Sequence, residues 1–205
     1  MRQDSGGEVL GGVEQVALRA RMHHEARNWL ILTDCSNAFN TEKRTAVVAE
    51  AGTSVPALTP FIAKCFRERP APVFFLMISG ERRRIECSSG VQPGDAMGPA
   101  LLCVPLLRML ERIREGFEPL GVEALAYLDD ISIGTSEITP DTVRVVPFLQ
   151  HELCEIGIAM NLSKKVALPP KGHVPTPEEI ALLGASVFAL QKGGGKGGWH
   201  AHGQR

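Results

Sequence analysis

The spacing of apolar residues in the first third of the chain predicts a helix, a buried strand and then two more helices. Apolar residues recur at near-helical spacing over 13–27. The apolar run 29–33 is typical of a buried strand, and it ends at Asp34. Residues 41–51 and 56–67 again have helical patterning, and a proline begins the second of these segments.

The middle of the chain predicts a hairpin followed by a long apolar helix. Residues 73–78 and 84–87 are strand-like and flank the turn Ser79-Gly80-Glu81. The turn-rich segment 90–99 leads into an apolar helix that ends near Arg114.

A second hairpin is expected further along. Only Asp129 and Asp130 separate the apolar runs 122–128 and 131–134, which places two acids at the tip of a tight turn. The remaining expected elements are one helix and two strands, at 141–156, 166–168 and 182–188.

This order of elements predicts an α+β domain, because strands first pair locally and helices then intervene. The chain of 205 residues is long enough for one such domain. We expect the domain to cover residues 13–190. A flexible N-terminus, 1–12, precedes it, and the glycine-rich tail 191–205 is expected to be disordered.

Charge and cysteine content narrow the class of protein. The net charge of −1 excludes overall basicity as an argument for nucleic-acid binding. The five cysteines form no CxxC pair, which argues against a disulfide framework or a zinc ribbon. The most apolar run is about half the roughly 20 residues that a membrane-spanning helix needs, and the N-terminus has no signal-peptide pattern. We therefore expect an intracellular protein of the nucleus or cytoplasm with no membrane partner.

Three carboxylates are candidate metal ligands. Asp34 ends one buried strand, and Asp129 and Asp130 lie between two others. If those strands are neighbours in one sheet, the acids meet at one edge, where oxygen ligands suit two Mg²⁺ ions. The alternative is that Asp129 and Asp130 are only a favourable turn pair and that Asp34 caps the next helix.

Five short motifs, in order along the chain, resemble those of reverse transcriptases. They are DCSNAFN at 34–40, SGVQPGDAMGP at 89–99, YLDD at 127–130, GIAMNLSK at 157–164 and LLG at 182–184. Their details are most similar to the non-LTR retrotransposon group. The resemblance implies the reverse-transcriptase palm, a ferredoxin-like antiparallel sheet with helices on one face.

The resemblance also implies a site with two Mg²⁺ or Mn²⁺ ions. Asp34 and Asp129 would be the principal ligands, together with the main-chain carbonyl of Cys35. Asp130 would be a weaker ligand. Lys164 would approach the triphosphate and protonate pyrophosphate, although a lysine in such a segment is more often only a solvated charge.

Further residues are implied to contact the nucleotide. Phe39 would lie under the sugar of the incoming nucleotide and block a 2′-hydroxyl, or else serve only as a core aromatic. Gln92, Gly94 and the helix from Asp95 would border the templating base and the nucleotide, where glycine allows close backbone approach. The same segment is otherwise an ordinary turn and helix cap.

A basic stretch is the candidate contact to nucleic acid. Residues 64–84 carry a local charge of +4, from six basic and two acidic side chains. Arg82, Arg83 and Arg84 form its densest part and suit backbone phosphates. A solvated hairpin turn explains the same charges. The partners implied by the resemblance are an RNA template, a DNA primer, dNTP and other parts of a retroelement polyprotein.

The sequence departs from the family pattern in two ways. Pro93 stands where the family usually has glutamine, and proline removes both that side chain and a backbone donor. Few residues precede Asp34 or follow Gly184, so most of the fingers and the thumb are expected to be missing.

Three functions follow as hypotheses. The first is an RNA-directed DNA polymerase, a nucleotidyltransferase, whose isolated chain has doubtful activity. The second is an inactive remnant that binds nucleic acid weakly. The third is another two-metal enzyme such as a nucleotide cyclase, which would need neither Phe39 nor the 90–99 turn.

Overall fold

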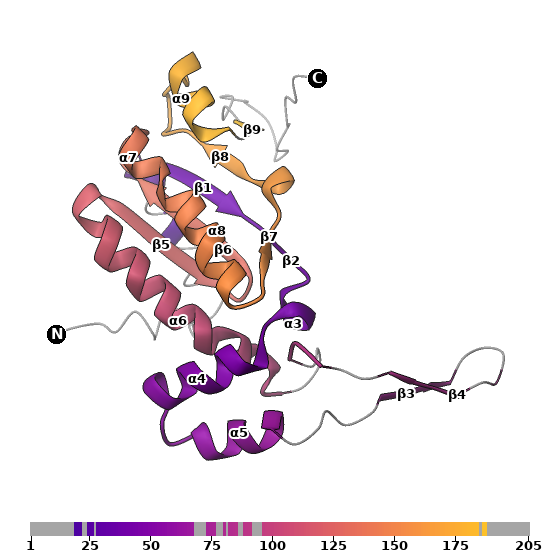
Figure 1. Ribbon diagram of the computed structural model, residues 1–205. Helices are drawn as coiled ribbons and strands as arrows, with labels where there is room; N and C mark the ends of the chain where they lie inside the picture. Colours follow the sequence, from indigo (N-terminus) through magenta and orange to yellow (C-terminus); the bar gives the residue numbers. More distant parts are fainter. Residues whose placement is uncertain are drawn as a thin grey trace.

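The protein is described here from a computed structural model, shown in Figure 1. The described residues are 19–21, 24–26, 28–67, 73–76, 80, 82–85, 88–91, 96–184 and 186–187. The expected flexible N-terminus and glycine-rich tail, and most of the helix expected over 13–27, lie outside them. Of that expected helix, residues 19–21, 24 and 25 are helical.

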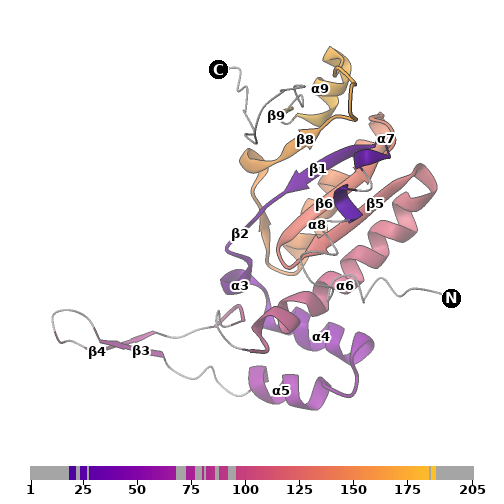
Figure 2. The same ribbon diagram turned by 180° about the vertical axis from the view of Figure 1, so that it is seen from behind.

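A five-stranded sheet forms the centre of the molecule. Its strands run in the order β5 (Val122–Tyr127), β6 (Asp130–Thr135), β1 (Trp29–Thr33), β8 (Val166–Leu168) and β9 (Ser186–Val187). Neighbouring strands are antiparallel except β8 and β9, which are parallel. Figure 2 shows β5, β6, β1 and β8 side by side. The α+β class is confirmed, with one parallel pair at the edge.

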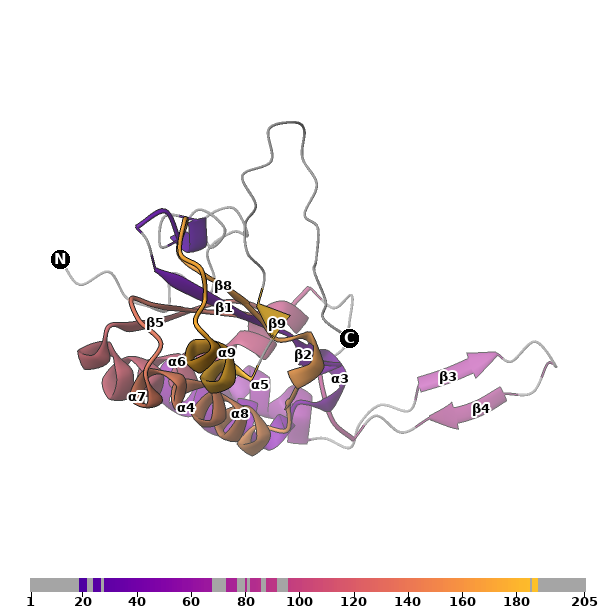
Figure 3. The ribbon, with the colours of Figure 1, turned by 90° about the horizontal axis from the view of Figure 1, so that it is seen from above.

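Helices cover one face of this sheet, as Figure 3 shows with the strands above and the helices below. The long α6 (Gly98–Phe117) and α8 (Val145–Glu155) lie against it, with the short α7 (Pro140–Val143) before α8. The core between these layers consists of large apolar side chains with little or no exposure. They include Trp29, Ile31, Leu102, Leu106, Ile113, Ile133, Leu149 and Leu153.

The three helices that follow β1 in the sequence form a second helical layer, which packs against α6. It contains α3 (Ala38–Thr41), α4 (Arg44–Ser54) and α5 (Thr59–Arg67), and α4 packs on both α5 and α6. The hairpin of β3 (Val73–Leu76) and β4 (Arg82–Ile85) extends away from this layer in Figure 1.

The remaining elements are short. Two are two-residue strands that pair with each other, β2 (Cys35–Ser36) and β7 (Ala159–Met160). Two are 3₁₀ helices, η1 (Glu118–Leu120) and η2 (Leu162–Lys164). The last is α9 (Pro177–Leu183).

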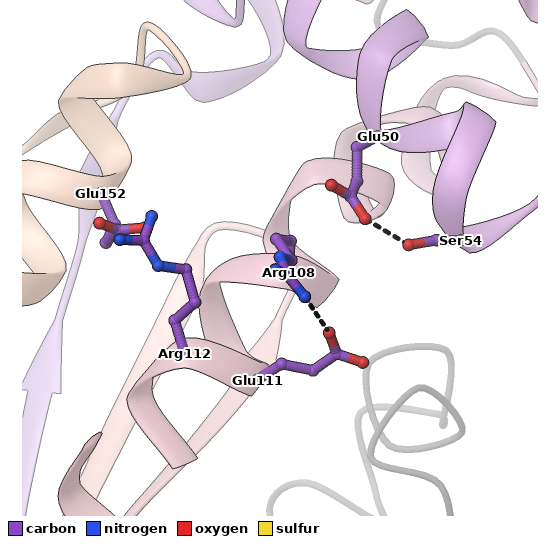
Figure 4. Close-up of polar contacts among 6 residues, drawn as sticks. All are labelled: Glu50, Ser54, Arg108, Glu111, Arg112 and Glu152. Atoms are coloured by element: carbon purple, nitrogen blue, oxygen red, sulfur yellow. Dashed lines mark hydrogen bonds and ion pairs between the residues drawn. The ribbon is translucent and has the colours of Figure 1, made fainter. Parts of the chain in front are cut away.

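Charged contacts join α6 to α8 on their outer side. Arg112 of α6 approaches Glu152 of α8 with a nitrogen–oxygen distance of 2.6 Å, and Figure 4 shows the two side chains facing each other. Glu152 is buried, whereas Arg112 is half exposed and also lies over the ring of Phe148. Arg108, one turn away, pairs with Glu111 of its own helix at the surface.

Three expectations about elements need correction. The strand expected over 182–188 is confirmed only at Ser186–Val187, since Leu182 and Leu183 belong to α9. Thr176 begins α9 with a capping box to Glu179, and Gly184 ends it in the left-handed conformation. The helix expected over 141–156 is divided at Arg144 into α7 and α8.

The third correction concerns the acidic hairpin. Tyr127 pairs directly with Asp130, so the two-residue loop is Leu128–Asp129 and not the two acids. Among the described residues, no helix is long and apolar enough to cross a membrane.

Candidate active site

The sheet register brings Asp34 close to the acidic turn. Thr33, the last residue of β1, pairs with Ile131 of β6, and its hydroxyl donates to the Ile131 carbonyl at 2.9 Å. One step beyond this pair, the antiparallel register places Asp34 next to Asp130. Asp129 lies in the adjoining turn, so all three acids stand at one edge of the sheet.

The turn that carries Asp129 is strained. Leu128 has φ 56°, a left-handed conformation that is rare for a bulky residue. The surrounding pairs, Tyr127 with Asp130 and Ala126 with Ile131, hold the turn in this shape. Strain of this kind persists where neighbouring structure over-determines the backbone, and it is concentrated at functional sites.

The acids influence the ionisation of the groups around them. Partial burial, followed by the negative charges of Asp129 and Asp34, raises the pKa of Asp130, and Lys164 partly opposes that shift. Burial and the same three carboxylates raise the pKa of the Cys35 thiol to about 12. The thiol therefore stays protonated at neutral pH and packs in the core. The group of Cys35 that can serve as a metal ligand is then its main-chain carbonyl oxygen.

Lys164 lies at the same edge, although its segment is far from Asp34 in the sequence. The two-residue ladder of β2 and β7 pairs Cys35 with Met160, and the Asn161 amide donates to the Asp34 carbonyl at 2.8 Å. Asn161 then caps η2, at the end of which the Lys164 ammonium lies 2.9 Å from Oδ2 of Asp34. The structure thus places Lys164 next to Asp34, and its expected approach to a triphosphate stays a prediction.

The donor set suits a divalent cation that prefers oxygen. In their present positions, no three acid, thiol or imidazole side chains of the described chain are close enough to hold a metal ion. Asp34 instead holds the ammonium of Lys164, a cation already at this edge. The three carboxylates and the main-chain carbonyl of Cys35 supply the oxygen ligands that Mg²⁺ or Mn²⁺ prefers.

Phe39 lies on the short helix α3, five residues after Asp34, and is half-buried against the core. The segment 88–91 is joined to the end of α3 by main-chain bonds, from Val91 to the Phe39 carbonyl at 2.7 Å and from Gly90 to the Glu42 carbonyl at 2.8 Å. A Cβ on Gly90 would lie 2.3 Å from the Phe39 oxygen. Only glycine permits this close approach.

Several predicted residues cannot be placed in the same way. Gln92, Gly94 and Asp95 lie outside the described residues, but they directly follow the segment joined to Phe39. The backbone of Arg82, Arg83 and Arg84 forms β4 and pairs with β3.

Comparison with known families identifies this arrangement. A model of the family "Reverse transcriptase (RNA-dependent DNA polymerase)" matches residues 6–187, which is most of the chain. The chain belongs to the reverse transcriptase family. Comparison with curated proteins gives no match.

Solved structures with the same fold include fungal telomerases. Telomerase from Candida tropicalis, in its apo form truncated from the C-terminal domain, is 17% identical with a TM-score of 0.59 over 80% of this chain. Telomerase from Candida albicans in complex with a TWJ fragment of telomeric RNA is 10% identical with a TM-score of 0.61 over 83% of this chain. This reverse transcriptase domain spans about a third of those chains, 36% and 32% respectively.

Sequence reasoning missed several residues that hold the reverse transcriptase site together. Lys43 and Arg44 each donate a hydrogen bond to the main chain of a distant segment. Basic residues that donate to carbonyls leave no periodic pattern, so only the family motifs around them could have drawn attention to them. The buried Glu42 was also missed, because it lay in a stretch that was expected only to be helical.

Proposed function

We propose that the chain is the palm of an RNA-directed DNA polymerase that transfers a nucleotide from dNTP to a primer 3′-hydroxyl with two divalent ions. The observation that carries this proposal is the convergence of Asp34, Asp129 and Asp130 at one edge of a reverse transcriptase sheet. The family membership leaves no observation that favours a nucleotide cyclase.

The acids are proposed to hold the metal ions. Asp34 and Asp129 are the principal ligands, the Cys35 carbonyl joins them, and Asp130 contributes more weakly, in keeping with its raised pKa. Bound ions of this kind activate the attacking hydroxyl and neutralise charge on the phosphates. The chain's own part is to fix these oxygens at one edge through the β1–β6 register and the strained Leu128 turn.

Residues around the acids are proposed to bind the nucleotide. Phe39 lies under the sugar and excludes a 2′-hydroxyl, and Gln92, Gly94 and Asp95 border the base. Lys164 leaves Asp34 for the triphosphate and protonates the pyrophosphate that departs. Its flexible ammonium already stands at the acids, which supports this role.

The proposed partners are an RNA template and a DNA primer. Arg82, Arg83 and Arg84 on the extended hairpin are proposed to contact backbone phosphates. The motif details support an origin in a non-LTR retrotransposon, with other parts of its polyprotein supplying further contacts. The telomerase neighbours, two of which were solved with telomeric RNA, are compatible with an RNA template.

Primer extension tests the proposal. The chain at saturating concentration and low salt is incubated with poly(rA), oligo(dT), dTTP and Mg²⁺ or Mn²⁺. We expect addition of the first nucleotides by the wild type, and loss of at least about 100-fold in rate for Asp129→Ala, in line with removal of a group that stabilises the transition state.

Glu115→Gln serves as the matched control, because it removes a carboxylate from the exposed surface of α6. It should leave the rate unchanged. The proposal is wrong if no addition depends on Asp129, or if Glu115→Gln is impaired as severely as Asp129→Ala.

A further inference from the structure

Lys164 lies at the end of a strap, residues 157–164, in which the side chains of Ile158 and Met160 are buried in the core. Its strand β7 contributes only two residues, paired with β2, and a two-residue ladder is weak by itself. The side chain of Lys164 is largely exposed, with 64% of its surface accessible, so its own packing does not fix its position. The position of Lys164 therefore depends on how the strap is held at its start, where the Ile158 amide also donates to the Leu153 carbonyl at 2.8 Å.

The start of the strap is clamped by the residue that precedes α4. The Lys43 amide donates to the Ile156 carbonyl at 2.8 Å, and the Lys43 ammonium donates to the Glu155 carbonyl at 2.9 Å. These carbonyls end α8, where unpaired acceptors and the helix dipole both favour a cation. Lys43 thus satisfies the last turn of α8 and ties it to the segment that carries Asp34 and Phe39.

Gly157 lets this contact form. It has φ 86°, and a Cβ there would lie 2.8 Å from Cγ of Lys43 and 2.9 Å from the Thr41 carbonyl. The chain turns at this glycine and enters β7. The corner and the Lys43 side chain therefore fit against each other with no room for a side chain at 157.

We infer that Lys43 is a positioning residue for Lys164. By fixing the corner 155–157 against the chain that carries Asp34, it sets the register of the strap and keeps the Lys164 ammonium at Asp34. Lys43 itself touches neither acid nor substrate in this scheme. The inference rests on the proposed function only for the use to which Lys164 is put, since the clamp and the ion pair are both structural contacts.

The chemical reactivity of Lys164 tests the inference without metal or nucleotide. Lysines are acetylated with a trace of acetic anhydride, and mass spectrometry gives the rate at each ε-amino group. Fragment ions separate Lys164 from its neighbour Lys165, and the exposed Lys171 is the internal reference. Asp34→Asn, which breaks the ion pair directly, defines the rate of the released lysine.

We expect Lys43→Met to raise the Lys164 rate toward that of Asp34→Asn, by up to about five-fold, the upper range for an exposed ion pair. Lys43→Arg, which keeps a long cationic donor, should restore the wild-type rate. Gly157→Ala, which disturbs the same corner from the other side, should raise the rate as well.

Arg44→Met is the matched control. Arg44 is adjacent to Lys43, carries the same charge, and also donates to a main-chain carbonyl at 2.8 Å, but its acceptor is Gly90 on the other side of the site. It should leave Lys164 at the wild-type rate. The inference fails if Lys43→Met and Gly157→Ala both leave Lys164 unchanged while Asp34→Asn releases it, or if Arg44→Met releases it equally. The absence of Asp129-dependent primer extension by the wild type would instead refute the proposed function.

Discussion

Glu42 is a carboxylic acid enclosed in the protein without a hydrogen-bond partner. It is fully buried at the end of α3, and neither carboxylate oxygen has a partner. Burial raises the pKa of Glu42 from 4.5 to about 9. The side chain is therefore neutral in the folded protein at pH 7, which avoids an unpaired buried charge.

This burial predicts that stability falls as pH rises. Between the unfolded pKa near 4.5 and the folded value of about 9, the folded chain binds more protons, so the free energy of unfolding decreases from about pH 5 to about pH 9. Glu42→Leu should remove that slope and stabilise the protein by about 3 kcal/mol at pH 7. Urea unfolding at pH 5, 7 and 9 measures both effects.

Glu50→Gln on α4 is the control for the pH series, because Glu50 lies at the helix surface and accepts a hydrogen bond from Ser54 one turn away. Its slope should match that of the wild type. If Glu42→Leu retains the wild-type slope, then Glu42 is ionised in the folded state and the assigned burial is incorrect.

Phe39 allows a test of sugar discrimination. Phe39→Val removes the ring proposed to block a 2′-hydroxyl and leaves the acids in place. We expect the preference for dTTP over UTP in single-nucleotide addition to drop by roughly ten-fold or more, since about 1.4 kcal/mol of discrimination corresponds to that factor. An unchanged ratio in a variant of normal thermal stability would show that Phe39 is only a core aromatic.

At the scale of elements, the sequence predicted the helices and strands that stand out as apolar runs. The strand 29–33 and the strand 166–168 have the predicted bounds, and the long helix α6 was expected from its apolar run. Burial creates these apolar runs, on both faces of β1 and along the core-facing side of α6, so they can be recognised without tertiary information.

Elements decided by local chemistry or by distant partners were predicted less well. The apolar residues of 182–188 suggested a strand, although the Thr176–Glu179 capping box and Gly184 indicate the helix α9. The β2–β7 pair could not be predicted, because two residues show no periodicity and their partners lie more than 120 positions apart. The convergence of the acids depended on the β1–β6 register, which the sequence supported only through the family motifs.

The contact between α6 and α8 predicts a difference between two arginines. Arg112→Met leaves Glu152 buried without its partner, and we expect a loss of about 1–3 kcal/mol in the free energy of unfolding. Arg108→Met, which removes an exposed pair, should change it by less than about 0.5 kcal/mol. Denaturant unfolding of both variants measures the contrast.

A third variant tests the cause of that loss. Adding Glu152→Leu to Arg112→Met removes the stranded carboxylate and should restore most of the stability. If the double variant is as unstable as Arg112→Met, the loss came from the packing of Arg112 on Phe148 rather than from the ion pair.

At the scale of the whole molecule, the site is assembled from segments far apart in sequence. β1 lies in the middle of the sheet between β6 and β8, and the side chain of Thr33 reaches a carbonyl 98 positions away. One domain thus brings Asp34 after β1, Asp129 of the β5–β6 turn, Asp130 at the start of β6 and Lys164 of the strap to a single edge.

The charge of the whole chain predicts weak, salt-sensitive binding to nucleic acid. A net charge of −1 supplies little long-range attraction, and the local charge of the 64–84 stretch must act alone. The 205-residue chain should therefore add only a few nucleotides for each encounter with a primer. Its binding to nucleic acid should weaken steeply between about 50 and 200 mM salt, because binding releases counterions from the phosphates. Products longer than a few nucleotides in a gel assay with trapped enzyme would contradict this prediction.

The most direct test of the central claim is a metal titration. Electron paramagnetic resonance of free Mn²⁺ gives the affinity of the wild type, Asp129→Asn and the surface control Glu115→Gln. We expect the wild type to bind Mn²⁺, because nearby carboxylates repel one another and a divalent ion relieves that repulsion. The control should bind Mn²⁺ as the wild type does, and Asp129→Asn should lose most of the binding. Equal Mn²⁺ affinity in the wild type and Asp129→Asn would contradict the assignment of the acids at the edge of β1 and β6 as the catalytic metal site.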